Sequence, residues 1–372
     1  MNFHSERPRV PAVLMRGGTS KGVFLHDRDL PPAGPERDDL LLRIMGSPDP
    51  MQIDGLGGSF SSTSKVVVVD SVDRDRVRYW FAQIGVDTAT VDWSGNCGNL
   101  TTAVGVFAIE EGVVDAGPDG IRRLVLHNAN TGVDIEAEII VSGGVPATRG
   151  SLAIAGVPGT GAPIVTRYLE PAGGVLGALL PTGSAVDRLV VDGVPVDFSL
   201  VDATHPYVFV DAADAGLAHD DARTPEQLGA DAAFLDRVER IRAAVAVRAG
   251  AAPSLAAATA EAPIVPRIVL IHPDADADLR VTAFSMGRVH RAVPMTAALC
   301  IGAAARIPGT LVAELAGLAS SAGAENQVRI RHPKGVATVV VETRGGADMI
   351  RSVGVVRTAR RLMDGHVYPR EH

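Results

Sequence analysis

The sequence predicts an α+β protein in which short strands wrap around two buried helices. Valine-rich runs of strand length recur between turns rich in Gly, Pro and Asn: Val66–Val69, Leu124–Leu126, Ile135–Val141, Val208–Val210, Ile268–Ile271 and Ala337–Val341. Two other segments, Leu100–Glu111 and Ala297–Ile307, are predicted as helices because a Gly or a Pro-Gly pair ends each. Both are apolar on nearly all sides, which is typical of helices buried among strands.

The surroundings of the two helices are related and indicate an internal duplication. Each helix has a Thr-Ala pair near its start, and each is followed by a turn containing His (His127 or His332) and then by a strand. Pieces this short also match by chance, so the pattern alone leaves the duplication open. We expect two similar domains, residues 1–183 and 184–372, that meet near Pro181–Ser184.

A third helix, amphipathic in character, is predicted from Thr224 onward. The segment Thr224–Gln227 has the form of a capping box with Pro at the first helical position. Apolar residues then follow at helical spacing: Leu228, Leu235, Val238, Ile241 and Val245. The Ala-rich stretch Ala249–Pro263 after this helix is predicted to be a loop.

Composition excludes several classes of protein. The 372 residues are 46% hydrophobic, which excludes a disordered chain. The net charge is −8 and no block of Lys and Arg forms a basic surface, so nucleic acid is not an expected partner. Two cysteines cannot form a disulfide framework. The N-terminus lacks the apolar core of a signal peptide, and no apolar run reaches 18 residues. We therefore expect a cytoplasmic protein without a membrane partner.

Cys97 is the first candidate for chemistry. It lies in Ser94–Asn99, directly before the first helix, where backbone N–H groups at the positive helix end would face an anion. A helix N-terminus also favours the reactive thiolate. An isolated cysteine is more often buried and inert, but the Gly and Asn residues around Cys97 favour the reactive interpretation. Cys300, inside the second helix, is interpreted as a packing residue.

Lys65 is the second candidate. It stands where the Gly/Ser loop Gly55–Ser64 enters a buried strand. Burial favours the neutral amine, which can act as a base, whereas a lysine at a strand edge can instead extend to the surface. A further donor-rich turn, Arg16–Gly22, lacks the spacing of a Walker loop, so nucleotide binding has little support.

No metal site or cofactor site is predicted. The ten histidines include no pair at the helical spacing of metal ligands. The acidic turn Asp274–Asp278 has Leu279 where a calcium loop requires Gly, and Gly156–Gly161 is not followed by a helix as a dinucleotide fingerprint would be. We expect neither a metal nor an organic cofactor.

Five motifs, in consistent order along nearly the whole chain, resemble the PrpF family: Met15–Gly22, Ile53–Gly58, Ser61–Lys65, Gly95–Asn99 and Arg357–Arg361. Its best-known members are 2-methylaconitate cis-trans isomerases, relatives of diaminopimelate epimerase. The resemblance implies two similar domains, each a β-barrel around one central helix, with the active site in the cleft between them. It is also compatible with a homodimer.

The resemblance implies that Lys65 and Cys97 are the acid/base pair and that no cofactor is needed. The implied substrates are small unsaturated di- and tricarboxylates. The residues implied or expected to bind them are Arg16, Thr19, Ser20, Lys21, Ser64, Asn96, Gly98, Asn99, Met286, His290 and Thr296. The form of Ser61–Lys65 looks closest to 2-methylaconitate members, which implies a place in propionate catabolism through the methylcitrate cycle.

Alternatives remain within and outside the family. Relatives also act as 4-oxalomesaconate tautomerase, methylitaconate Δ-isomerase or aconitate isomerase, and two departures, His205 in place of an expected Asn and Gly177-Ala178 in place of a more polar turn, leave the substrate open. A catalytically silent tricarboxylate-binding protein that supports a partner dehydratase is the alternative of another class.

Overall fold

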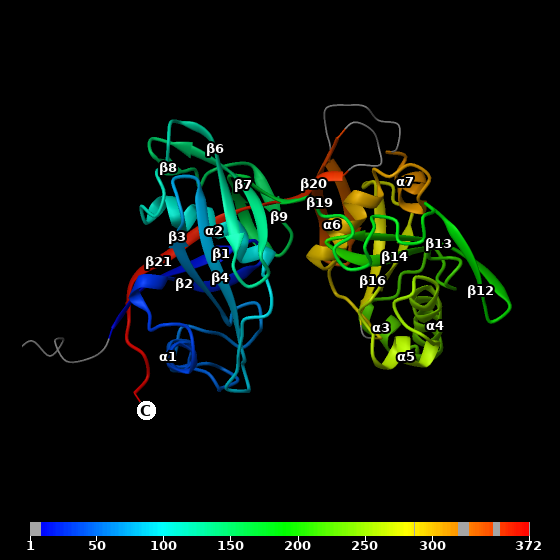
Figure 1. The fold of residues 1–372 in the computed structure, drawn as a ribbon, viewed down its shortest axis with the longest axis horizontal. Coiled ribbons are helices and arrows are strands. Elements are labelled where there is room, and N and C mark those ends of the chain that lie inside the picture. The colour runs from blue at the N-terminus through cyan, green and yellow to red at the C-terminus, as the bar shows by residue number, and fades with distance from the viewer. Residues whose placement is uncertain (1–8, 286, 319–326, 345–349, 372) are drawn as a thin grey trace, which may run out of the picture. The chain divides into compact units, whose positions relative to one another are not determined.

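The computed structural model describes residues 9–285, 287–318, 327–344 and 350–371, which form two compact units (Figure 1). Unit 1 spans Met1–Arg167 and Val356–His372, and unit 2 spans Tyr168–Val355. These limits differ from the predicted domains 1–183 and 184–372. The last strand, β21 (Ala359–Val367), pairs with β1 (Val10–Gly17) along its whole length, so the C-terminal segment belongs to unit 1.

Unit 1 consists of a large sheet around helix α2 (Gly98–Glu110) and a separate two-stranded sheet formed by β9 (Leu152–Ile154) and β10 (Val157–Gly161). Besides β1 and β21, the large sheet of unit 1 contains β2 (Ser20–His26), β3 (Lys65–Ser71), β4 (Arg76–Ile84), β5 (Val91–Asp92), β6 (Gly120–Asn128), β7 (Val133–Ser142) and β8 (Val145–Pro146). Helix α1 (Pro35–Met45) and the 3-10 turn η1 (Asp27–Asp29) connect β2 to β3. Successive strands pair in alternating directions. Pairing is antiparallel in β1–β2, β3–β4 and β6–β7, and it is parallel in β2–β3 and β4–β6, which lie between them in this succession.

Unit 2 repeats this plan around helix α6 (Met295–Ala304). Its strands are β12 (Asp187–Val191), β13 (Val194–Ala203), β14 (His205–Asp211), β15 (Arg267–His272), β16 (Leu279–Ser285), β17 (Arg288–Val289), β18 (Gln327–His332) and β19 (Gly335–Thr343). The pairings β13–β14, β14–β15, β15–β16, β16–β18 and β18–β19 follow the same succession as in unit 1. Strands β11 (Ile164–Leu169) and β20 (Ile350–Arg357) carry the chain between the units. The predicted duplication and α+β class are confirmed.

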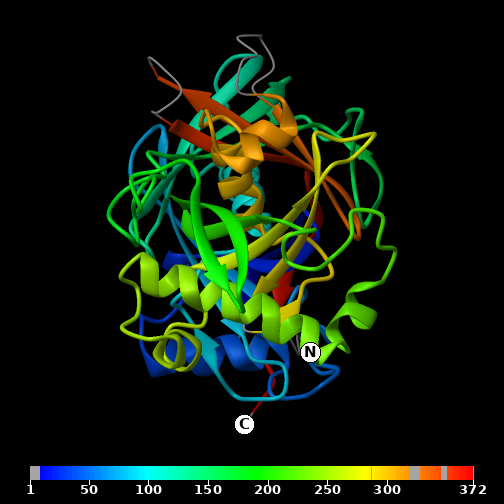
Figure 2. The same ribbon diagram turned by 90° about the vertical axis from the view of Figure 1, so that its right-hand side faces the viewer.

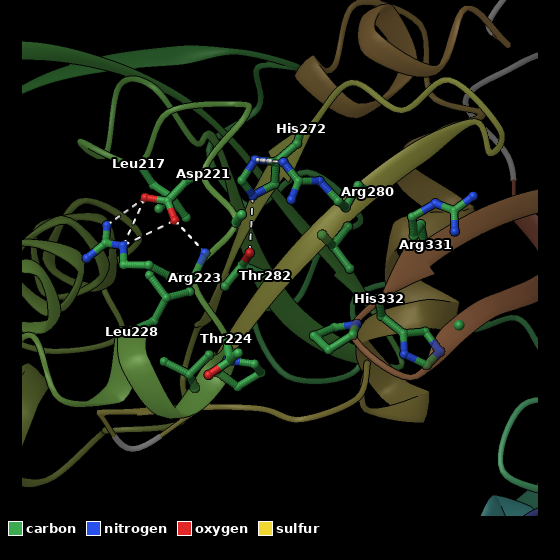
Figure 3. Close-up of a pocket in the computed structure, with 16 residues that line it drawn as sticks. Leu217, Asp221, Arg223, Thr224, Leu228, His272, Arg280, Thr282, Arg331 and His332 are labelled. Carbon is green, nitrogen blue, oxygen red and sulfur yellow. Dashed lines mark hydrogen bonds and ion pairs between the residues drawn. The ribbon is translucent and has the colours of Figure 1, made fainter.

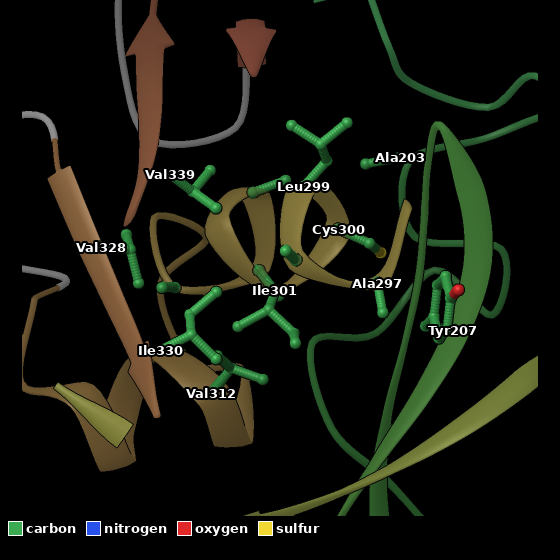
Figure 4. Close-up of a cluster of buried hydrophobic side chains, with 14 of the residues drawn as sticks. Ala203, Tyr207, Ala297, Leu299, Cys300, Ile301, Val312, Val328, Ile330 and Val339 are labelled. Carbon is green, nitrogen blue, oxygen red and sulfur yellow. The ribbon is translucent and has the colours of Figure 1, made fainter. Parts of the chain in front are cut away.

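Both central helices are buried on all sides. Every residue of α2 from Leu100 to Ile109, and every residue of α6 from Ala297 to Ala304, is buried. Figure 4 shows α6 enclosed by side chains of β13, β14, β18 and β19. Because neither helix has a polar face, each is covered by strands rather than set against one side of a sheet. All six predicted strands and both helices lie where the sequence placed them.

The segment between β14 and β15 differs from its prediction in two places (Figure 2). The capping box at Thr224 is present, but the predicted single helix is two, α3 (Pro225–Gly229) and α4 (Ala232–Arg248), because Asp231 caps a new helix by accepting from the Phe234 N–H. The Ala-rich stretch is not a plain loop. It contains a short helix, α5 (Leu255–Ala260), which is capped by Ser254. Ala258 of this helix packs against alanines of α4.

Helix α7 (Leu311–Ala316) completes unit 2. Among the helices of the described ranges, none is long and apolar enough to cross a membrane.

Gly302 of α6 and Gly105 of α2, each the eighth residue of its helix, provide a test of the packing. A Cβ at Gly302 would lie 2.4 Å from Val339 Cγ1 and 3.2 Å from Val339 Cβ, whereas a Cβ at Gly105 would meet the flexible end of Ile139, Cδ1, at 2.5 Å. Alanine gains about 1 kcal/mol of helix propensity over glycine, and overpacking costs about 1–3 kcal/mol. Because the clash at Gly302 includes the Cβ of Val339, which cannot rotate away, we expect the overpacking cost to exceed the propensity gain and Gly302→Ala to lower the free energy of unfolding by up to about 2 kcal/mol.

In the matched variant Gly105→Ala, the Ile139 side chain can move away, and we expect a change below about 1 kcal/mol. Urea unfolding followed by circular dichroism measures both changes. A Gly302→Ala protein as stable as the unsubstituted chain would contradict this account of the α6 packing.

Candidate active site

Cys97 is the N-cap residue of α2 and is partly exposed. Its carbonyl accepts the first helical hydrogen bond, from the Thr101 N–H at 2.9 Å, while its thiol makes no capping bond. The thiol Sγ lies 3.9 Å from Ser20 Oγ on β2. The Cys97 side chain therefore stands at the helix end where the first N–H groups have no intrahelical partner.

The turn between β1 and β2 packs against the same helix end. Gly18 has φ +50°, and a Cβ there would lie 2.2 Å from Asn99 Oδ1, so the close approach requires glycine. The Asn99 amide Nδ2 donates to Thr19 Oγ1 at 3.0 Å and lies 3.5 Å from Ser20 Oγ. The Lys21 N–H donates to the Ser62 carbonyl, which ties this turn to the loop before Lys65.

Lys65 is the first residue of β3 and is only 8% exposed. Its Nζ lies 2.5 Å from Gln83 Oε1, directly across the β3–β4 ladder, and 4.9 Å from the centre of the Phe81 ring. The Gln83 amide Nε2 donates to the carbonyls of Ser64 (2.8 Å) and Ser61 (3.1 Å). Because Nε2 is held by these carbonyls, the Gln83 oxygen must face Lys65.

One face of β2 brings Lys65 and Cys97 into the same neighbourhood. A Cβ at Gly22 would lie 3.4 Å from Lys65 Cβ and 2.6 Å from Leu100 Cδ1 in the first turn of α2. Ser20, beside Cys97, is two residues away and so lies on the same face of the strand as Gly22. The structure thus gathers both predicted acid/base residues, with Thr19, Ser20 and the Gly98–Asn99 start of α2, within unit 1.

A buried polar network lies behind Cys97. Asn96 Oδ1 accepts from the Tyr79 hydroxyl at 3.1 Å and from the Thr101 hydroxyl at 3.0 Å, and the Asn128 amide donates to the Tyr79 oxygen at 3.2 Å. Burial raises the pKa of Tyr79 well above its usual value, so Tyr79 stays neutral. This network fixes the backbone on the inner side of the Cys97 turn.

Two residues expected to bind substrate, Arg16 and Ser64, have hydrogen-bond partners within the protein. Arg16 Nη1 donates to the carbonyls of Gly18 (3.0 Å) and Thr358 (2.7 Å), and partial burial, with Arg360 nearby, lowers the pKa of Arg16. Ser64 is fully buried, and its hydroxyl accepts from Gln52 and donates to the Ile84 carbonyl. This differs from the substrate contact expected of Ser64, because a hydroxyl without exposed surface supports the loop and cannot reach a ligand.

The remaining predicted residues belong to unit 2. Thr296, in the first turn of α6, has its hydroxyl 2.9 Å from the Tyr207 hydroxyl and 3.4 Å from Arg267 Nη1. Burial and the charge of Arg267 lower the pKa of His290. His205, where Asn was expected, donates from Nε2 to the Ile264 carbonyl at 2.6 Å. Met286 lies outside the described residues.

The duplication shows how the two helix ends differ. Lys65 and Arg267 are the first residues of the corresponding strands β3 and β15, and Cys97 and Pro294 are the N-caps of α2 and α6. Unit 2 therefore has a guanidinium and a proline where unit 1 has an amine and a thiol. Cys300 is fully buried and donates to the Val201 carbonyl, and burial raises the pKa of its thiol.

Gln83, Phe81 and Tyr79 were not found from the sequence. They lie on β4, whose alternating pattern shows which residues point inward but not which residue of β3 each one faces. Only the Lys65–Gln83 register places the glutamine oxygen against the lysine amine.

Two similar units, each with strands around a buried helix, define a duplicated α+β protein, and the candidate cysteine and lysine of unit 1 lie at the helix end and the strand start of one copy. The family model described as "PrpF protein" matches residues 7–370, and the chain belongs to that family. It is 41% identical to a (4E)-oxalomesaconate Δ-isomerase of a Novosphingobium species, covering 96% of this chain and 97% of that protein.

Two further relatives and one solved structure agree with this assignment. The chain is 39% identical to a 3-methylitaconate isomerase of Eubacterium barkeri (98% of each protein) and 39% identical to a 2-methyl-aconitate isomerase of Shewanella oneidensis (96% of each). The crystal structure of a methylitaconate-Δ-isomerase matches with a TM-score of 0.87 at 39% identity, covering 98% of this chain and 96% of that one.

The two cysteines should differ sharply in reactivity. Cys97 is partly exposed at a helix N-terminus, whereas Cys300 has no exposed surface and its burial disfavours the thiolate. We expect iodoacetamide to modify Cys97 in the native protein and to leave Cys300 unmodified until urea unfolds the chain. Peptide mass spectrometry measures both sites. Modification of Cys300 before Cys97 would contradict the described helix packing.

Proposed function

We propose that the chain is a cofactor-independent isomerase of small unsaturated tricarboxylates and that Lys65 and Cys97 transfer the proton. The observation that carries the proposal is the placement of a lysine amine and a partly exposed thiol along one face of β2, beside the N-terminus of α2. Relatives at 39–41% identity, named for isomerisation of methylitaconate, methylaconitate and oxalomesaconate, support the substrate class.

In this proposal, unit 1 supplies the three groups that allylic proton transfer needs: a proton acceptor, a proton donor and hydrogen-bond donors for the developing negative charge. One member of the Lys65–Cys97 pair removes a proton from the carbon next to the double bond, and the electron pair delocalises as a dienolate into a carboxylate. The first N–H groups of α2, which have no partner within the helix and no bond from the Cys97 side chain, stabilise the developing negative charge. The proton then returns, either to the same carbon after bond rotation or to the far end of the allyl system.

The first choice of substrate is 2-methylaconitate, with cis-trans isomerisation, which would place the enzyme in propionate catabolism through the methylcitrate cycle. The Ser61–Lys65 motif and the 2-methyl-aconitate isomerase relative favour it. The second candidate is a 1,3-allylic shift of 4-oxalomesaconate, favoured by the 41% identical relative. In unit 2, Thr296 and His290 are proposed to contribute to substrate binding.

The acid/base assignment is tested by substitution. Loss of a positioned acid or base costs on the order of 10²-fold or more in rate, so we expect Lys65→Ala and Cys97→Ala each to lose at least about that much turnover. The matched control Cys300→Ala removes the buried thiol, and we expect its turnover to stay about unchanged. This result would show that the loss in Cys97→Ala comes from the position of that thiol and not from the removal of a cysteine as such. Proton NMR in D₂O with 2-methyl-trans-aconitate, trans-aconitate, methylitaconate and 4-oxalomesaconate measures isomerisation and deuterium exchange.

The outcomes of this experiment are distinct. Turnover of the keto acid alone would favour the 1,3-allylic candidate. Binding of these acids by calorimetry without isomerisation or exchange would favour the non-catalytic alternative. Normal turnover by folded Lys65→Ala and Cys97→Ala proteins would refute the assignment.

Gln83 should control how Lys65 is presented to the substrate. A neutral amide oxygen accepts one N–H from Lys65 without adding charge, whereas a carboxylate at the same place would hold the lysine as an ammonium ion. We expect Gln83→Glu to lose about tenfold or more in kcat near neutral pH, with partial recovery at higher pH. Gln83→Leu, which removes the acceptor, should lose rate at every pH.

The pH dependence of kcat, with circular dichroism to confirm folding, distinguishes these variants. A purely structural role for Gln83 would change stability without this difference between Glu and Leu. Equal pH profiles for the two variants would contradict the role of the amide oxygen.

A further inference from the structure

Unit 2 contains a cavity of about 510 Å³ that the proposed reaction does not use (Figure 3). It lies at the end of β15 marked by His272, whereas Arg267, at the other end of this strand, contacts Thr296. The two ends are about 16 Å apart at the usual rise per residue. Much of the cavity wall is apolar: Leu217, Ala222, Pro225, Leu228, Val281, Val289 and Pro333.

Three arginines line this cavity, and two of them are neutralised. Arg223 pairs with Asp221 and Asp231, both at 2.9 Å, and Arg331 pairs with two carboxylates of the Asp274–Asp278 turn. Arg280, in contrast, forms no ion pair with a carboxylate within the described part of the chain. Its Nη2 is held by the His219 carbonyl and by His272 Nδ1 at 3.2 Å.

Two hydrogen bonds, drawn as dashed lines in Figure 3, join Arg280 to His272 and His272 to Thr282, and the chemistry of arginine fixes their direction. Arg280 can only donate, so His272 Nδ1 must accept and His272 must carry its proton on Nε2. That N–H donates to Thr282 Oγ1 at 3.1 Å. His272 is 1% exposed, and burial together with Arg280 lowers its pKa to about 4, so this neutral tautomer persists at neutral pH.

The chain of bonds ends in donors that no described residue uses. The Thr282 hydroxyl has accepted from His272, so its own hydrogen is left to donate. Nη1 and Nε of Arg280 also have no acceptor in the described ranges. Arg280 and Thr282 are two residues apart on β16 and share one face of the strand. A ligand group that only accepts hydrogen bonds and carries negative charge, a carboxylate, matches these donors.

Neighbouring acids limit the charge of such a ligand. Asp221, paired with Arg223, lies near Arg280, and Asp211 accepts from His219 Nε2 at 2.7 Å near His272. Further negative charges on the ligand would face these carboxylates. We propose that this cavity binds a monocarboxylate with an apolar body, its carboxylate on Arg280 and Thr282 and its body against the apolar wall.

Binding of sodium hexanoate to the full-length protein, measured by isothermal titration calorimetry, tests the proposal, with 1-hexanol as an uncharged probe of similar size. We expect hexanoate to bind at least about tenfold more tightly than 1-hexanol. Arg280→Met should weaken hexanoate binding about tenfold or more, and the isosteric Thr282→Val should weaken it by about threefold to tenfold. Arg331→Met, which removes a neutralised guanidinium from the same cavity, is the matched control and should change affinity less than about threefold.

The comparison of the two probes needs no variant, so it stands even if a substitution impairs folding. Equal binding of hexanoate and hexanol, no hexanoate binding at millimolar concentration, or unchanged binding by folded Arg280→Met protein would overturn the proposal. Because the readout is binding and not turnover, Lys65→Ala should bind hexanoate like the unsubstituted chain. Failure of the isomerase assignment would therefore leave this result unaffected.

Discussion

A helix without a polar side can be buried only if other elements cover it on every side, and this constraint shapes both units. Helices α2 and α6 have no such side, and strands in the same succession of parallel and antiparallel pairings enclose each of them. Burial along the helix leaves its N-terminus as the place where unpaired N–H groups can meet a ligand. The position of Cys97 follows from this packing, because it is the residue that caps α2.

The two copies use one scaffold with different side chains at the same places. The first residue of β3 is Lys65 and that of β15 is Arg267, while the helix caps are Cys97 and Pro294. An amine and a thiol can each gain or lose a proton, whereas a guanidinium stays charged and a proline has no ionisable side chain. Repetition of the fold therefore did not repeat the chemistry, and unit 1 holds the groups suited to proton transfer.

The proposals for the two units each depend on one basic side chain, Lys65 in unit 1 and Arg280 in unit 2, and both side chains are held by neutral partners. Lys65 is held by the amide oxygen of Gln83, and Arg280 by a carbonyl and a neutral imidazole. A carboxylate in either place would form a charge-assisted pair and compete with an anionic ligand. Many other arginines in the described ranges pair with acids, for example Arg223 and Arg331. The contrast explains why these two cations remain available although the net charge of the chain is −8.

Local sequence patterns determined the elements that depend on neighbouring residues. Valine runs, helix-ending glycines and the Thr224 capping box each act over a few residues, so strands, central helices and that cap could be predicted. The motifs around Lys65 and Cys97 likewise identified the family along nearly the whole chain. The break at Asp231 and the short helix α5 were missed, because cap bonds and alanine packing against α4 decided them.

Only the tertiary structure decided which distant residues meet. The return of β21 to β1, the burial of Ser64 and the contact between Lys65 and Gln83 all depend on strand pairing between segments far apart in sequence. A sequence pattern with a period of two shows which face a side chain occupies, but it contains no information about the register with a partner strand. For that reason the sequence determined the candidate acid/base residues of this protein, and the fold determined the groups that position them.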